Sequence, residues 1–222
     1  MQSDTVSAQH EFAPHAIDAP QPPSTTPMKI EELLALPEGN GERFEMVHGA
    51  IVRKPMAGGS HDYFAYRLLL GLGPYVDEHN LGAITLSQAG YEITLPGEDP
   101  TVYIPDLAFV RAERVPQEDS PEWTRFWKLA PDLVVEVASP SQSQKEMRKR
   151  AADWLAAGTR LVWLTWPPHK RVDAYYSSGS AAQSAAPASI KPQVFHLPDT
   201  LDGRDVVPGF TYPVASIFKG VH

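Results

Sequence analysis

The sequence predicts an α/β fold in which helices cover the faces of a β-sheet. Short, nearly continuous apolar runs at 102–110 and 133–138 are typical of strands that are covered on both faces in the middle of a sheet. Alternating apolar and polar residues on either side of His48-Gly49 predict a β-hairpin. A strand, a helix and a second strand then follow one another between residues 133 and 166, which is the order expected of an α/β sheet.

Composition and charge narrow the class of protein. The chain has 222 residues, 42% of them hydrophobic, which suits one domain with a buried core. It has no cysteine, so disulfides and cysteine metal sites are excluded. The first residues do not read as a secretory signal and no apolar run reaches the roughly 18 residues of a membrane helix, so we expect a cytoplasmic protein. The formal net charge of −8 argues against an extensive basic surface, and the basic cluster comprises Lys145, Arg148, Lys149 and Arg150.

The N-terminal third begins with a segment that we predict to be disordered. Residues 1–27 hold five prolines among Ser, Thr, Gln and Ala, and such a composition cannot bury enough apolar surface to fold. The folded domain is therefore expected to span 28–222. It starts with a short helix from Met28 that Pro37 ends, and the hairpin strands follow within 43–53.

A long helix and two further strands are expected next. Ser60 is a candidate N-cap, and the glycines and proline at 71–74 are expected to disturb the far end of the helix. The apolar face of this helix would carry His61, Phe64, Ala65 and Leu68. Strand patterns follow at 83–86 and 90–95.

The second half of the chain predicts a capped helix between strands. Residues 143–146 form a capping-box pattern, and the helix that they begin would stop at Gly158. The remaining elements are strands at 160–166 and 171–176, a mobile Ser/Ala-rich loop at 177–189, and a closing segment at 206–214.

A carboxylate lies inside each of two apolar strand patterns. Asp106 lies within 104–108 and Glu136 within 134–138, each on the same strand face as apolar neighbours. An unpaired buried carboxylate is costly, so each must meet a cation, a strong donor or a proton. If the two strands are adjacent, both carboxylates can point at one spot and bind Mg²⁺ together with water and phosphate. The alternative is a structural carboxylate that is bonded to arginine or to backbone N–H groups.

These residues carry a family resemblance. Pro105-Asp106, followed about thirty residues later by Glu136-Val-Ala, resembles the PD-(D/E)xK nuclease signature with its last position changed. The wider pattern comprises Phe44-Glu-Met-Val-His-Gly-Ala-Ile-Val, His61 at a helix start, Ile104-Pro-Asp-Leu-Ala-Phe-Val, and Ala130-Pro-Asp-Leu-Val-Val-Glu-Val-Ala-Ser-Pro-Ser. Over about residues 28–219 the chain resembles the Uma-two family of restriction-endonuclease-like proteins.

The resemblance implies a restriction-endonuclease-like mixed central sheet flanked by helices, with an N-terminal hairpin and C-terminal strands. It also implies Mg²⁺ or Mn²⁺ as cofactor and DNA as substrate. Asp106 and Glu136 match the metal-binding carboxylates, and Glu45 matches an early acidic position that completes the metal shell or positions a ligand. His61 matches a histidine that contacts phosphate or tunes a carboxylate. The alternatives are an exposed strand glutamate at 45, for which Arg43 and Lys54 are available partners, and a packed ring at 61.

The chain departs from the motif where the signature has lysine. Ala138 stands there, so the resemblance implies that the catalytic cation comes from the following helix, where Arg150 matches and Lys149 is adjacent. Arginine stays protonated, so Arg150 can clamp phosphate but is a poor base, and water activation would fall to the metal, to Lys149 or to His61. The alternative is a row of surface ion pairs formed by Glu146, Arg150 and Asp153.

Three functions remain open at the level of sequence. The first is a metal-dependent endonuclease that hydrolyses DNA phosphodiester bonds. The second is a catalytically degraded domain of the same fold that binds nucleic acid or protein, which Ala138, Arg150 and the negative net charge favour. The third is a structural regulator that assembles as a homodimer. Binding of Mg²⁺ or Mn²⁺, and its loss when Asp106 is removed, would separate the first from the others.

Overall fold

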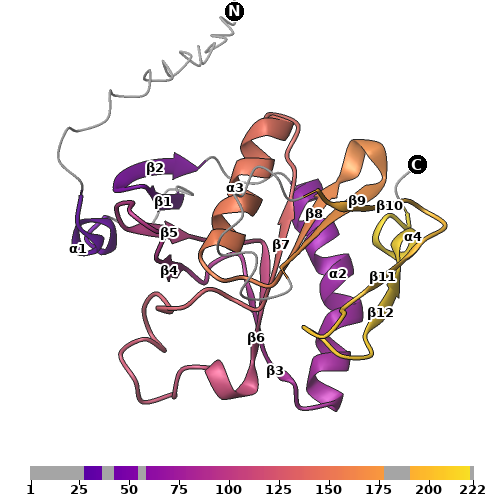
Figure 1. Ribbon diagram of the computed structural model, residues 1–222, viewed down its shortest axis with the longest axis horizontal. Coiled ribbons are helices and arrows are strands. Elements are labelled where there is room, and N and C mark those ends of the chain that lie inside the picture. Colours follow the sequence, from indigo (N-terminus) through magenta and orange to yellow (C-terminus); the bar gives the residue numbers. More distant parts are fainter. Residues whose placement is uncertain (1–27, 37–42, 55–58, 178–190, 221–222) are drawn as a thin grey trace, which may run out of the picture.

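The computed structural model describes residues 28–36, 43–54, 59–177 and 191–220 (Figure 1). The predictions of disorder for 1–27 and of mobility for most of the loop at 177–189 lie outside these residues.

A six-stranded sheet forms the centre of the molecule, with the strand order β10-β9-β8-β7-β6-β3. Its strands are β3 (Gly82–Leu86), β6 (Leu107–Arg111), β7 (Leu133–Val137), β8 (Leu161–Trp166), β9 (Arg171–Tyr176) and β10 (Gln193–Phe195). The β7–β8 pair is parallel and the other pairs are antiparallel. The parallel pair is joined through helix α3 (Gln144–Ala156), as a crossover connection requires. The predicted mixed α/β sheet is therefore confirmed.

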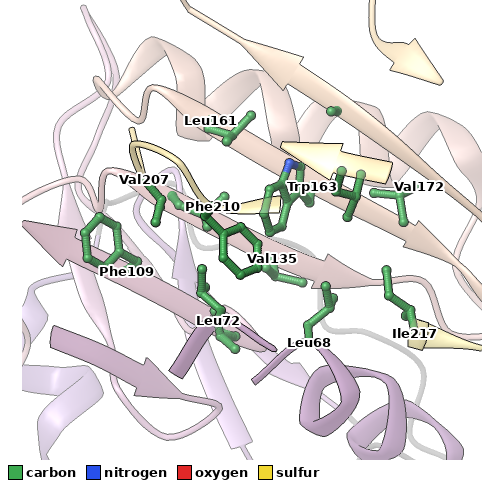
Figure 2. Close-up of a cluster of buried hydrophobic side chains, with 14 of the residues drawn as sticks. Leu68, Leu72, Phe109, Val135, Leu161, Trp163, Val172, Val207, Phe210 and Ile217 are labelled. Carbon is green, nitrogen blue, oxygen red and sulfur yellow. The ribbon is translucent and has the colours of Figure 1, made fainter. Parts of the chain in front are cut away.

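The two faces of this sheet pack against different helices. Val135 on β7 belongs to the core cluster formed with α2 (Gly59–Glu78), which includes Leu68 and Leu72 (Figure 2). Val134, the next residue on the opposite face, belongs to a second cluster with Trp154 of α3. Apolar residues on both faces of β7 explain why its sequence is a continuous apolar run.

A second, four-stranded antiparallel sheet lies beside the first, with the order β2-β1-β5-β4. Its strands are β1 (Arg43–Val47), β2 (Ala50–Lys54), β4 (Tyr91–Ile93) and β5 (Thr101–Tyr103). The β1–β2 hairpin turns at His48 and Gly49, whose φ angles of 49° and 75° are those of a two-residue type I′ turn. The predicted hairpin is confirmed.

The prediction of one strand over 102–110 is wrong. The chain forms β5 in the smaller sheet and β6 in the central sheet, and it breaks at residues 104–106. Pro105 has no N–H to donate to a strand ladder, so the apolar pattern cannot continue as one hydrogen-bonded strand. The break leaves Asp106 at the N-terminal end of β6, where the chain passes from the smaller sheet to the central sheet.

Helix α2 is longer and more regular than the sequence indicates. It begins at Gly59, so Ser60 lies within the helix rather than at its cap, and it continues through Pro74 to Glu78. The glycines do not end it because Leu72 and Val76 remain fully buried against the sheet. Gly71 allows a close approach, since a Cβ there would lie 2.3 Å from the Tyr212 ring.

The remaining elements close the ends of the domain. They are α1 (Ile30–Leu34), the 3₁₀ turns η1 (Ala112–Arg114) and η2 (Pro167–His169), β11 (Thr200–Asp202), β12 (Thr211–Pro213) and α4 (Val214–Ile217). Helix α3 has the predicted capping box, in which the Glu146 N–H donates to Ser143 Oγ at 3.2 Å and the Ser143 N–H donates to the Glu146 carboxylate at 2.8 Å. Among the described residues, none of the helices combines the length and apolar character needed to cross a bilayer.

Candidate functional site

Asp106 and Glu136 meet at one end of the central sheet. The antiparallel register of β6 and β7 places Leu107 opposite Val135, and one further step along both strands places Asp106 opposite Glu136. The Val137 N–H donates to Asp106 Oδ2 at 2.7 Å. Both carboxylates are only 5% exposed. The two strands are adjacent, which is the condition under which the sequence placed both carboxylates at one spot, and the carboxylates line the same cavity.

The electrostatics of Asp106 are strongly perturbed. Burial raises the pKa of Asp106, and the charge of Glu136 raises it further, to about 8, against the lowering effect of the Val137 N–H. His61 Nε2, at the start of α2, lies 3.3 Å from Asp106 Oδ2. Burial lowers the pKa of His61, so the ring is neutral at pH 7. The protein alone therefore does not supply enough positive charge to stabilise an ionised Asp106.

Arg150 is the centre of a buried ion-pair network. From α3 its Nε donates to Glu136 Oε1 at 2.6 Å, and its two Nη atoms donate to the two oxygens of Glu45 at 2.8 and 2.7 Å. Its guanidinium lies 4.1 Å from the centre of the Tyr103 ring. Burial disfavours the charge, but Glu136 and Glu45 outweigh it and raise the pKa of Arg150 well above its ordinary value. Arg150 is 9% exposed, so the interpretation as a surface ion pair is wrong.

Glu45 is held by cations and by the backbone. In addition to Arg150, the Ile104 N–H donates to its Oε1 at 2.9 Å and Lys54 Nζ lies 3.3 Å from its Oε2. Burial raises the pKa of Glu45, but Arg150 and Lys54 outweigh it and the net pKa is lowered. The side chain is 1% exposed, so the alternative of an exposed strand glutamate is wrong. Both oxygens are engaged, which makes Glu45 a residue that positions Arg150.

One oxygen of each central carboxylate remains for a cation. Glu136 Oε1 accepts from Arg150 and from Trp154 Nε1 at 2.9 Å, and Asp106 Oδ2 accepts from Val137. Among the described residues, no hydrogen bond uses Glu136 Oε2 or Asp106 Oδ1. The described residues contain no ready-made cluster of three or more acidic or histidine ligands. Two carboxylates, with water and a substrate phosphate, nevertheless suit a single Mg²⁺ ion.

The cavity over these carboxylates has a volume of about 470 Å³, within the usual range of ligand sites. The hairpin lines one side with Arg43, Arg53 and Lys54, and the turn at 139–142 lines another. The cavity is thus acidic at its base and basic along the hairpin.

Lys149 and Ala138 do not contribute to this cavity. Lys149 Nζ lies 2.9 Å from Asp153 Oδ2 and 2.7 Å from His48 Nε2, and these groups line an adjoining pocket of about 180 Å³, which shares Lys54, Gln142 and Arg150 with the cavity. Ala138 is 6% exposed and packs in the core under α3. Of the two helix cations that the sequence suggested, the structure brings Arg150 to the carboxylates and keeps Lys149 away.

Sequence reasoning missed three contributors to the site. Tyr103 and Trp154 contact Arg150 and Glu136, but in the sequence they read as ordinary apolar positions. Lys54 was considered only as a partner of Glu45, although it lines the cavity. The alternation of the hairpin was the available signal, because it places 43 and 45 on one face of β1 and 52 and 54 on the same face of β2.

Comparison with known proteins relates this arrangement to a family. Residues 30–215 match the Uma2 family, described as "Putative restriction endonuclease". The structure is similar to the crystal structure of a putative nuclease belonging to DUF820 from Anabaena variabilis ATCC 29413, with a TM-score of 0.68 and 23% sequence identity. The match covers 86% of this chain and 98% of that one. A search of curated proteins found no match.

The structural similarity confirms the expected restriction-endonuclease-like fold. The family match spans nearly the whole described domain, including both central carboxylates and the helix that carries Arg150. The chain belongs to the Uma2 family of restriction-endonuclease-like proteins.

Proposed function

We propose that the protein is a nuclease that hydrolyses DNA phosphodiester bonds with Mg²⁺ or Mn²⁺ held by Asp106 and Glu136. The observation that carries the proposal is the pairing of these buried carboxylates at the base of one cavity. The repulsion between them contributes to raising the pKa of Asp106 to about 8, and a divalent cation between them would remove this repulsion. Membership of a family described as "Putative restriction endonuclease" supports a nuclease-like activity.

A metal ion at this position would polarise the phosphodiester and lower the pKa of a water molecule that attacks it. The residues around it would hold the geometry. Arg150 fixes Glu136 through Oε1, and Glu45 fixes Arg150 through a two-point contact. The Val137 N–H fixes Oδ2 of Asp106 from the neighbouring strand. The oxygen that each carboxylate would offer to the cation is therefore set by bonds to its other oxygen.

His61 is placed to act on Asp106 or on a nearby proton. Its Nε2 lies 3.3 Å from Asp106 Oδ2, and the neutral ring can either donate a hydrogen bond to the carboxylate or accept a proton. Arg150 cannot serve as the base because its pKa is raised well above its ordinary value. We assign Arg150 to charge stabilisation and to the positioning of Glu136.

The test is cleavage of supercoiled plasmid DNA with Mg²⁺ or Mn²⁺. We expect nicked and linear products with either metal, no product with EDTA, and loss of cleavage in Asp106→Asn and Glu136→Gln. Asp202→Asn is the matched control because Asp202 is a half-exposed carboxylate on β11, outside the residues that line the cavity. Titration calorimetry with Mn²⁺ should show weakened binding in the two site variants alone. Unchanged Mn²⁺ affinity in both would refute the metal site.

One observation favours the alternative of a non-catalytic nucleic-acid-binding module. Arg150 already neutralises part of the acidic charge that a metal would neutralise, since it contacts both Glu136 and Glu45. In that case the protein would bind DNA with the same affinity in Mn²⁺ and in EDTA, and neither plasmid, single-stranded DNA nor RNA would be cleaved. This pattern would replace the proposed nuclease with the binding module.

A further inference from the structure

Two cations lie directly opposite each other on the hairpin that borders the cavity. The antiparallel register of β1 and β2 pairs Arg43 with Lys54, and the same alternation pairs Glu45 with Val52 two residues further on. Side chains at these four positions share one face of the hairpin. All four residues line the cavity that holds Asp106 and Glu136.

A cross-strand pair of like charges is unfavourable unless something negative lies nearby. Glu45 supplies one negative charge, but Arg150 occupies both of its oxygens at 2.7 and 2.8 Å. Lys54 Nζ approaches Glu45 less closely, at 3.3 Å, and its side chain is 28% exposed. The local carboxylate is thus shared by two cations, so Lys54 retains donors that can bind an anion.

The guanidinium of Arg43 also has a hydrogen-bond donor that is not satisfied. Its Nη1 donates to the Ser87 carbonyl at 2.8 Å, which anchors the side chain, while its Nε is buried and has no hydrogen-bond partner among the residues that the structure describes. An unsatisfied buried donor on a positively charged group is costly and indicates a place for an acceptor. The turn on another side of the cavity, at 139–142, has no charged residue, and three of its side chains bond within the turn.

We propose that Arg43 and Lys54 form a phosphate-binding edge that seats the DNA backbone along the hairpin. This inference rests on the proposed function, because it names how the substrate of that site is held. Arg43 would offer a fixed planar donor and Lys54 a mobile point charge. The edge accounts for DNA binding by a chain whose formal net charge is −8, since the contacts are concentrated beside the carboxylates.

The test is the salt dependence of binding to a fluorescent 20-base-pair DNA duplex, measured by anisotropy with EDTA present so that the DNA stays intact. The slope of log affinity against log salt counts phosphate contacts at about 0.9 per contact. We expect Arg43→Gln and Lys54→Gln each to lower the slope by about 0.9 and the double variant by about 1.8. Arg43→Lys and Lys54→Arg should keep the slope, which separates charge from folding.

Arg204→Gln is the matched control because Arg204 is an exposed cation that does not line the cavity. Wild-type binding with the same slope in the double variant would overturn the phosphate edge and leave the nuclease proposal standing. A loss of slope in Arg204→Gln as large as that in Arg43→Gln or Lys54→Gln would also overturn the phosphate edge, because DNA would then contact cations across the surface rather than at the hairpin. Absence of both DNA binding and plasmid cleavage in the wild type would refute the proposed function and the edge together.

Discussion

Replacement of Arg150 by alanine tests the charge balance of the whole site. Arg150 is the only cation that contacts both Glu45 and Glu136 among the described residues, and all three side chains are buried. Breaking a buried ion pair by removing one partner costs about 3–5 kcal/mol, because an uncompensated charge remains. Asp106 would add a third nearby carboxyl. For a domain of this size such a loss lowers the melting temperature by about 6–20 °C.

The effect should depend on pH. In the wild type the pKa of Glu45 is lowered, so its contribution to stability is present above its unfolded pKa and is lost as the pH falls through the folded value. Without Arg150, burial is the largest remaining influence and raises the pKa of Glu45, so the contribution reverses and is lost as the pH rises. The variant should therefore be closer to wild type at pH 5 than at pH 7.

Urea denaturation followed by tryptophan fluorescence is the appropriate assay, because Trp154 lies in the network. The control is Arg150→Met combined with Glu45→Gln, which removes both members of the two-point ion pair and should recover much of the stability. Millimolar Mn²⁺ should partly rescue Arg150→Ala by binding to the carboxylates that the substitution leaves without a counter-charge. A loss below about 1 kcal/mol at pH 7 would show that Arg150 does not neutralise the site.

Three further predictions follow from the same geometry. Because the pKa of Asp106 is raised to about 8, its contribution to stability is present below its unfolded pKa and is lost as the pH rises through 8. In metal-free urea titrations, Asp106→Asn should remove this decline in the free energy of unfolding. A pH profile equal to that of the wild type would contradict the raised pKa. Ala138→Lys should destabilise the domain by about 1–3 kcal/mol rather than restore the motif, because Ala138 is buried under α3; a melting temperature equal to wild type would contradict this. Lys149→Gln should leave Mn²⁺-dependent plasmid cleavage within about twofold of wild type, because Lys149 lies outside the cavity. Removal of a transition-state stabiliser is expected to lower the rate roughly ten- to thousandfold, and a loss of that size would show that Lys149 takes part in the reaction.

The sequence was informative where local patterns decide the structure. The hairpin at His48-Gly49 and the capped helix after Ser143 were predicted because turn and cap residues act over a few positions. The pairing of Asp106 with Glu136 was predicted only conditionally, since adjacency of two strands cannot be read from either strand alone. The resemblance supplied the restriction-endonuclease-like arrangement of the elements.

The missed features depend on contacts between distant parts of the chain. Arg150 and Glu45 are 105 positions apart, and neither residue type in its local pattern indicates burial. Arg150 lies on a helix rich in charged residues, so its local pattern predicts a surface residue. It is buried because β1, which carries Glu45, packs against it. The division of 102–110 into two strands depends on Pro105 at the point where the chain leaves one sheet for another, whereas hydrophobicity continues across the break.

The peptide groups flanking Ile104 join the two sheets through the site itself. The Ile104 N–H donates to Glu45 Oε1, and its carbonyl accepts from Arg150 Nη2 at 3.1 Å. The smaller sheet is thus fastened to the central sheet partly by the same charges that hold Glu136 in place. A ligand that binds Glu136 or Arg150 will change the strength of the hydrogen bonds at Ile104. Its binding will therefore alter the stability of strands that it does not contact. The rates of amide hydrogen exchange in β1 and β5 should therefore change when the site is occupied, and they can be measured with any candidate ligand before the substrate is identified.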